Sequence, residues 1–388
     1  MEADRGEERI GFMGTINRYV LRQYVKVLLI CFLSMTGLYV IIDGLNNLDD
    51  LLELAQEGNL PAVLGEYYGA RAMAFFDRTS ALMTLVAATF TVTAMQRSNE
   101  MAALMAAGIP KFRVVAPLIV AATLLSLLAA AGRELVIPRF REKLTQNTRD
   151  LLGGSREQLA PRYDHWTDIL LAGREARVSQ QRIGEPAFRL PPGLGLFGSQ
   201  LLARQAEYRP AEGDRPSGYL LDQVSQPDNL SAIPSFYLED EPLILSPHDT
   251  PWLAADQCFV VSQITYEQLV ASDAWRQFSS TSELIQGLHN PSLDFAADVR
   301  VAVHARLIQP ALDITLLLLA LPVVLARESR NVFLAAGLCV LIVGAFFLVV
   351  LGCHALGNSS LVRPALAAWF PLLIFAPLAR LTSQAFWQ

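Results

Sequence analysis

The chain has 388 residues, of which 52% are hydrophobic and 18% are charged, and its formal net charge is −6. Soluble domains average about 25% charged residues. The composition therefore excludes an ordinary soluble enzyme, and the acidic balance gives no indication of nucleic-acid binding. The four cysteines form no Cys-x-x-Cys pair, and Cys31, Cys339 and Cys353 lie in or beside apolar runs. This pattern argues against a disulfide framework or a zinc site.

Apolar residues concentrate in six long runs, three near each end of the chain. The runs are Tyr24–Ile42, Thr79–Met95, Val114–Gly132, Leu307–Ala326, Val332–Gly352 and Pro364–Ala379. A helix needs about 20 apolar residues to cross a bilayer. The second and sixth runs are short, but neighbouring apolar residues can extend them. The alternative, buried helices of a large soluble protein, is disfavoured because six such runs exceed what a soluble core uses. We therefore expect six transmembrane helices.

The charges around these runs predict how the chain crosses the membrane. Arg18, Arg22 and Lys26 precede the first apolar stretch closely, and several acidic residues follow it. The positive-inside rule then places the amino terminus in the cytoplasm. Alternation puts the basic segment Gln96–Arg113 and the carboxyl terminus on the same side. The predicted organisation is a first helical part over residues 1–136, an outer domain over 137–300 and a second helical part over 301–388.

The outer segment has a different character from the rest. It holds 13 of the 21 prolines and no long apolar run. Short apolar segments separated by turn formers, Gly184 among them, predict a β sandwich or curled sheet. The expected strands are Asp168–Ala172, Arg174–Ser179, Gln200–Tyr208, Ser217–Val224, Ser235–Leu238 and Pro242–Leu245. Helices are expected at 139–152 and at 281–289, the second capped by Thr281 or Ser282.

Motifs for chemistry are missing from the sequence. It contains no Walker A sequence, no H-E-x-x-H, no G-x-S-x-G and no G-x-G-x-x-G, and its five histidines are scattered. An intramembrane enzyme would need two convergent polar groups at bilayer depth, and Asp313 alone stands out. Energy for any work is therefore expected from a partner or a gradient.

The most informative short segment is SNEMAALMAAGIPKFRVVAP, residues 98–117. It predicts a helix that begins at Glu100 and ends at Gly108, with Pro110 after it. A short helix between two spans on the inner face suits the docking of a partner. A plain surface turn is the alternative that the pattern alone leaves open.

Several segments together resemble the lipopolysaccharide-export permease family of the LptF/LptG type. Beyond the Glu-x-x-Ala-x-x-x-x-Gly pattern from Glu100 to Gly108, the resemblance is carried by INRYVLRQYVKVLL, GRELVIPRF, ARLIQPALDITLLLLALPVVLARESR and LVRPALAAWFPLLIF with its Trp-x-Pro. It implies six transmembrane helices, arranged three and three around an inserted periplasmic β-jellyroll-like domain. It also implies a multi-pass protein of the bacterial inner membrane.

The resemblance implies partners and a mechanism that composition cannot supply. Members pair with a second permease, here a paralogue or a second copy of the chain, and with a cytoplasmic ABC ATPase dimer. That separate dimer hydrolyses ATP, so the chain itself needs no cofactor and is no enzyme. The lipid enters between spans one and five and passes through the outer domain toward a periplasmic bridge protein. The coupling helix would comprise Glu100, Ala103, Leu104, Ala107 and Gly108.

Four residues are candidates for a lipid path. Arg133 is the best cation near the outer end of span three, although pairing with Glu134 would serve equally as a structural role. Asp313 lies in span four, where Arg306 two turns earlier could neutralise it. Leu201 and Leu221 would line an apolar interior of the outer domain, or simply build its closed core. A rival function remains open, a membrane-anchored structural or mechanotransmitting subunit of another ABC system that acts on a periplasmic protein.

Overall fold

In a computed structural model, the described residues form two units, one of long helices and one built on a β sheet. Each unit is described by itself. The described residues are 2–49, 60–145, 159–177, 181–192, 194, 196–213, 215–238, 241–270, 272–293, 297–325 and 332–383.

Within the described residues, six helices are long and apolar enough to cross a membrane. They are α1 (Glu2–Asn46), α3 (Leu60–Arg97), α5 (Lys111–Leu135), α11 (Ala297–Leu325), α12 (Val332–Asn358) and α13 (Pro364–Ser383). Three precede the inserted β domain in the chain and three follow it, which confirms the predicted three-plus-three arrangement. The short helix α4 (Glu100–Ala106) lies between α3 and α5, and the 3-10 turn η1 (Ile137–Phe140) follows α5.

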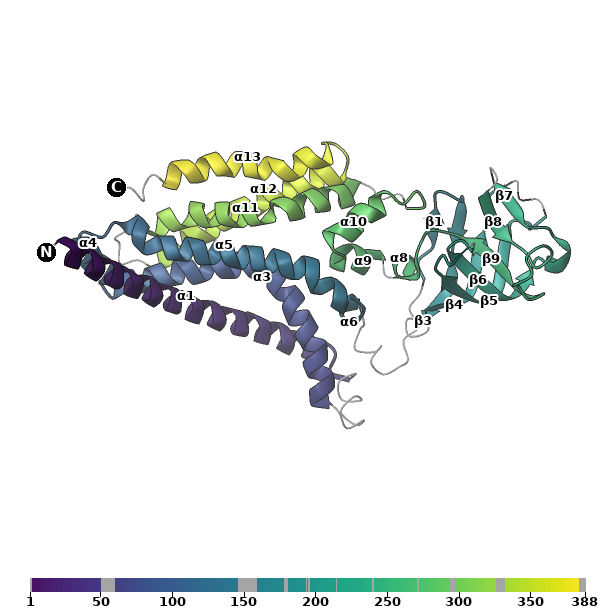
Figure 1. Ribbon diagram of the computed structural model, residues 1–388, viewed down its shortest axis with the longest axis horizontal. Coiled ribbons are helices and arrows are strands. Elements are labelled where there is room, and N and C mark those ends of the chain that lie inside the picture. The colour runs from purple at the N-terminus through teal and green to yellow at the C-terminus, as the bar shows by residue number, and fades with distance from the viewer. Residues whose placement is uncertain are drawn as a thin grey trace. The chain divides into compact units, whose positions relative to one another are not determined.

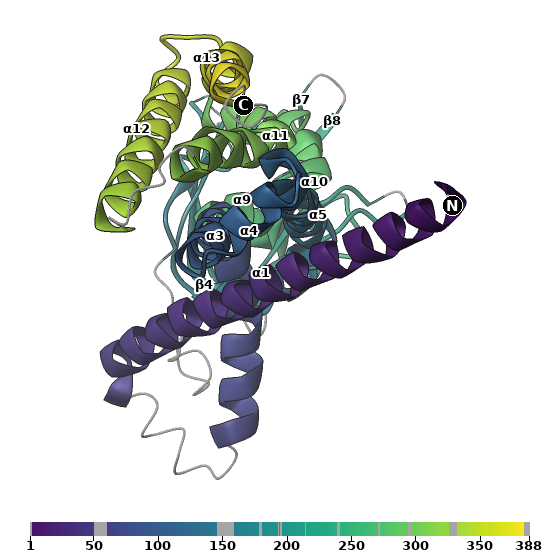
Figure 2. The ribbon, with the colours of Figure 1, turned by 90° about the vertical axis from the view of Figure 1, so that its left-hand side faces the viewer.

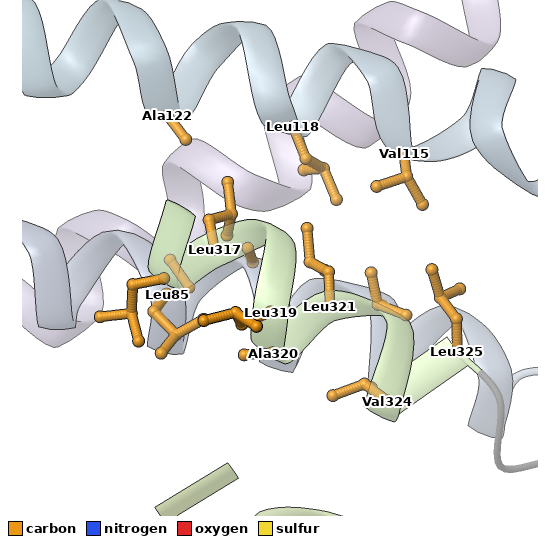
Figure 3. Close-up of a cluster of buried hydrophobic side chains, with 14 of the residues drawn as sticks. Leu85, Val115, Leu118, Ala122, Leu317, Leu319, Ala320, Leu321, Val324 and Leu325 are labelled. Carbon is orange, nitrogen blue, oxygen red and sulfur yellow. The ribbon is translucent and has the colours of Figure 1, made fainter. Parts of the chain in front are cut away.

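The helical unit is built around α11, which packs against α12 and α13 on one side and against α3 and α5 on the other (Figures 1 and 2). Figure 3 shows the apolar centre of this packing, where Leu85 of α3, Leu118 of α5 and Leu317 of α11 are buried together. Helix α1 lies along the outside of α3 and α5. The interior of the unit is therefore made by α3, α5 and α11.

The β unit is an antiparallel half-barrel sheet with an order of β1-β2-β4-β5-β6-β9-β8-β7, and β3 pairs with β4. Its described strands are β1 (Arg162–Asp164), β2 (Ile169–Leu171), β3 (Gly173–Arg177), β4 (Arg182–Arg189), β5 (Gln200–Arg209), β6 (Gly218–Gln226), β7 (Phe236–Leu238), β8 (Glu241–Leu245) and β9 (Cys258–Val261). Ile183 and Phe188 of β4 and Leu201 of β5 are fully buried and form part of the core.

The six predicted strands are all present, but the sequence analysis missed β1, β4 and β9. Gly184, expected in a turn, lies inside β4 and pairs with Gln205 of β5. A Cβ at Gly184 would meet the Glu175 side chain, so the glycine permits close strand pairing. Strand β9 was missed because its four residues are all buried and show no alternation.

Short helices complete the β unit: α6 (Arg141–Thr145), η3 (Leu230–Ala232), α8 (Tyr266–Val270), α9 (Ser272–Phe278) and α10 (Thr281–Leu288). The helix expected at 139–152 is represented by η1 and α6, and residues 146–152 lie outside the described residues. Helix α10 confirms the expected 281–289 helix, but its cap is Ser280 rather than Thr281 or Ser282. The Ser280 side chain accepts a hydrogen bond from the Glu283 amide, and Glu283 reciprocates, which is a capping box.

Candidate functional sites in the helical unit

The loop between α3 and α5 holds the predicted coupling helix. Helix α4 is anchored to the bundle by Met101, which is buried, and by Leu104 and Met105, which pack against the apolar centre. Its other face is exposed and carries Ala103 and Ala107. Leu104 therefore holds α4 in place, whereas the two alanines are available to a partner.

The end of α4 follows the prediction. Gly108 has a φ of +80°, a backbone conformation that L side chains rarely adopt. Its amide donates to the Met105 carbonyl, and the Ile109 amide donates to the Leu104 carbonyl. These bonds satisfy carbonyls at the helix end. The helix stops sharply, leaving Gly108 exposed beside the alanine face.

Glu100 at the start of α4 is held by a residue that the sequence analysis did not single out. The Tyr19 hydroxyl of α1 donates toward both carboxylate oxygens of Glu100, at 3.1 Å from Oε1 and 3.0 Å from Oε2. Helix α4 is thus tied to α1 by a side-chain hydrogen bond.

Arg133, the candidate lipid-binding cation, is part of an ion pair. Its Nε lies 3.0 and 2.9 Å from the two carboxylate oxygens of Asp77 on α3, and its Nη2 lies 2.9 Å from Oδ1. Both side chains are mostly buried. The partner is therefore Asp77 on a neighbouring helix rather than the expected alternative, Glu134. The geometry is bidentate, the arrangement in which arginine binds carboxylates most strongly.

Asp313 lies at the meeting point of α3, α5 and α11. Its Oδ2 accepts a hydrogen bond of 2.6 Å from Ser126 Oγ, and its Oδ1 accepts one of 2.8 Å from Gln309 Nε2. These partners are neutral, in contrast to the Arg306 pairing considered from the sequence. A carboxyl group at this depth avoids the cost of facing lipid because it is enclosed by polar groups.

A small polar pocket adjoins the carboxyl group of Asp313. The pocket is lined by Ser80, Ala81, Thr84, Ala122, Ser126, Asp313 and Ile314. Three of these residues carry hydroxyl groups, and they lie among apolar side chains where α3, α5 and α11 meet. The pocket brings Asp313 together with α3 and α5, but the Arg133–Asp77 pair is not among its lining residues.

Leu201 and Leu221 lie apart from these helical sites. Both are fully buried in the β unit, on β5 and β6. In the pairing of β5 with β6, Leu221 lies opposite Ala206. The two leucines are therefore buried on neighbouring strands without being direct pairing partners. Their burial is compatible with either interpretation offered from the sequence, an apolar lipid path or a closed core.

Six apolar helices, three before and three after an inserted antiparallel β domain in the chain, with a short helix between the second and third, are the architecture of a multi-pass membrane protein. The family model of the Lipopolysaccharide export system permease LptF/LptG matches residues 18–168 and 221–384.

The chain therefore belongs to the LptF/LptG family and is a permease of the lipopolysaccharide export system. Such permeases are transmembrane subunits without catalytic activity. Comparison with curated proteins finds no match. The family assignment confirms the resemblance read from the sequence and favours it over a subunit of another ABC system.

Proposed function

We propose that this permease couples ATP hydrolysis by a separate cytoplasmic ABC ATPase dimer to the extraction of lipopolysaccharide from the inner membrane. The observation that carries the proposal is α4. It is a short helix anchored by Met101 and Leu104, with a small-residue face that permits close approach. Glu100 supplies a carboxylate for a basic groove on the ATPase. ATP binds to that partner, so the permease needs no cofactor of its own.

The proposed orientation places both termini and α4 in the cytoplasm. The amino end of α1, helix α4 and the carboxyl end of α13 lie at the same end of the helical unit (Figure 1). That end carries Arg97 in the last turn of α3, Lys111 at the start of α5 and Arg380 in the last turn of α13. Cytoplasmic ends of membrane helices carry an excess of Lys and Arg. The β domain is then periplasmic and delivers the lipid to a bridge protein.

The proposed partner in the membrane is a second permease of the family or a second copy of this chain. The low burial of α1 and α12 supports this pairing. In the most apolar stretch of 18 residues, 0% of α1 and 6% of α12 is buried. These two helices are spans one and five, between which we propose that the lipid enters. Their uncovered apolar faces suit acyl chains on one side and a partner helix on the other.

We further propose that Arg133, Asp313, Leu201 and Leu221 lie along the lipid path. Arg133 would exchange Asp77 for a lipid phosphate, and Asp313 would contact a polar headgroup. Acyl chains would enter the interior to which Leu201 and Leu221 contribute. Photo-crosslinkers at the two leucines are expected to capture lipopolysaccharide. The control is the same probe at Tyr237, which is 53% exposed. Capture at Tyr237 alone would indicate a closed core.

The decisive test of coupling is Glu100→Arg. The substitution reverses the charge offered to the ATPase. We expect it to reduce lipopolysaccharide export at least about tenfold, because the new arginine would face the basic groove of the ATPase and repel it. The permease should still fold, because Glu100 is partly exposed. The matched control is Glu241→Arg, the same charge change at an exposed position of β8. Normal export by Glu100→Arg at normal abundance, with the ATPase still co-purifying, would refute docking through this residue.

A further inference from the structure

Tyr19 joins two elements that are far apart in the chain, α1 and α4. Its hydroxyl lies between the two carboxylate oxygens of Glu100, at 3.1 and 3.0 Å. The Tyr19 side chain is 46% exposed, so it adds little to the apolar packing. Its chief contribution is this polar contact.

The surroundings show how α1 is held at this end. Val20 and Tyr24, on the next turn of α1, are fully buried in the same cluster as Met101 of α4 and Val115 of α5. The inner end of α1 is therefore packed into the same apolar cluster as α4, through α3 and α5.

Further along, α1 is held differently. Phe32 and Tyr39 contact Phe76 and Phe75 of α3 through their rings. The Tyr68 hydroxyl of α3 donates to Asp43 near the end of α1. None of the most apolar window of α1 is buried, so the helix depends on these edge contacts. A helix held by few contacts moves when one of its anchors moves.

We propose that Tyr19 is a positioning residue for energy coupling: it orients the Glu100 carboxylate and transmits displacement of the coupling helix to the first span. The inference rests on the proposed docking role of Glu100 and adds the link from that site to α1. A glutamate side chain has three rotatable bonds, and a donor placed between its two oxygens restricts them. The phenol uses one lone pair on each oxygen at most, so the Glu100 side chain keeps further acceptor capacity for a basic partner.

The test uses the complete exporter, with its ATPase and partner permease, reconstituted in vesicles that contain lipopolysaccharide. Tyr19→Phe removes only the hydroxyl group. We expect ATP hydrolysis to stay within about twofold of the unmodified complex, whereas lipopolysaccharide released per ATP falls about threefold to tenfold, the range for the loss of one ordinary hydrogen bond. The matched control is Tyr163→Phe, which removes a similar exposed bond to Asp168 in the β unit.

Glu100→Ala separates failure of this inference from failure of the proposed function. Normal export per ATP by Glu100→Ala would overturn the coupling role of Glu100 and, with it, this inference. Loss of export by Glu100→Ala with normal export per ATP by Tyr19→Phe would overturn the inference alone. If Tyr19 acts through Glu100, the double variant behaves as Glu100→Ala does; an additional loss would indicate a separate structural role for Tyr19.

A second readout follows the motion itself. Spin labels at Leu21 on α1 and Ala106 on α4, both exposed, are introduced in a background without the native cysteines. In the complex with Tyr19, the distance between the labels should stay constant as ATP is bound and hydrolysed, because the two elements move together. In Tyr19→Phe the distribution should broaden on ATP binding. Equal behaviour of the two proteins would contradict transmission through Tyr19.

Discussion

Two pairs of membrane-length helices are packed in opposite ways. Of the most apolar window, 56% is buried in α11 and 50% in α3, against 6% in α12 and 0% in α1. The less buried pair is the more apolar of the two, and α12 is the most apolar of the six helices long enough to span a membrane among the described residues. Lipid tails are as apolar as leucine, so hydrophobicity places a helix in the membrane without selecting its neighbours.

The polar pairs of the interior helices lie within the packed unit, whereas those of α1 lie near the two ends of its apolar span, at Tyr19 and Asp43. The interior helices carry polar groups that meet across helix boundaries: Ser126 with Asp313, Arg133 with Asp77, and the Gln96 side chain with the Val324 carbonyl at 3.2 Å. Interhelical hydrogen bonds of this kind add stability in a membrane. Helices α1 and α12 are edge elements on opposite sides of this interior (Figure 2). They are the elements at which we propose contact with lipid and with a partner permease.

The largest expected contrast is between leucines of the two pairs. Leu317 of α11 is 1% exposed and Leu348 of α12 is 73% exposed. Leu317→Ala leaves a cavity in a close-packed interior and should cost about 3 kcal/mol of unfolding free energy, whereas Leu348→Ala should cost at most about 0.5 kcal/mol. Unfolding of the purified chain in detergent measures both. Similar losses for the two variants would mean that the interior and edge helices do not differ in packing.

Asp313 tests whether polar pairing or packing dominates inside the bundle. Asp313→Leu leaves the Ser126 and Gln309 donors without their acceptor and should cost about 2 kcal/mol. Asp313→Asn keeps an acceptor oxygen and should cost less than about 1 kcal/mol.

The same variants test the lipid path through export at matched expression. Export by the Asp313→Asn variant but not by the Asp313→Leu variant would show that a polar side chain is required at this site and a charge is not. Full export by Asp313→Leu would remove the residue from the lipid path, whatever its effect on stability.

Local chemistry explains which features could be predicted from the sequence. The six spans follow from apolar runs, and the end of α4 follows from Gly108, which adopts a positive φ, with Pro110 two residues later. The cap of α10 was predicted one or two residues too late in the chain, because Thr281 and Ser282 are also residue types that favour the cap position. Strand β4 was missed because Gly184 and Pro186 resemble turn residues, although β3 and β5 pair with the strand on either side.

The site partners could not be predicted because they depend on helix rotation and on long-range contact. Tyr19 and Glu100 are separated by 81 residues, and Ser126 and Asp313 by 187. A single serine in an apolar run carries no signal that it faces a carboxylate. Asp77, the partner of Arg133, lies within α3, and the pair depends on the packing of α3 on α5.

Two glycines of α12 lie in different surroundings and should therefore respond to substitution in opposite directions. A Cβ at Gly357 would lie 2.6 Å from Ala367 Cβ and 2.7 Å from Val301 Cγ2, whereas at Gly352 no described atom lies within 4 Å. Gly357→Ala should cost about 1 kcal/mol through overpacking. Gly352→Ala should stabilise the helix by about 0.5 kcal/mol, because alanine loses less backbone entropy than glycine. Stabilisation by both variants would mean that α12 has room for a side chain at Gly357 as well as at Gly352.

The cysteines also differ between the two kinds of element, and they differ in expected reactivity. Cys31 on α1 and Cys339 and Cys353 on α12 are partly exposed, whereas Cys258 on β9 is fully buried. Burial raises the pKa of the Cys258 thiol from 9.0 to about 12. Its thiolate fraction at pH 8 is therefore about a thousandfold lower than that of a free thiol, and the thiolate is the reactive form.

In a variant with Cys258 as the sole cysteine, iodoacetamide should modify the folded chain extremely slowly and the urea-unfolded chain at the rate of a model thiol. The same shift makes the β unit less stable as the pH rises above about 9, because the unfolded thiol ionises there while the folded thiol stays protonated. Rapid modification of Cys258 in the folded chain would mean that the sheet opens around β9, and the β unit would then belong with the loosely held α1 and α12 rather than with the packed interior.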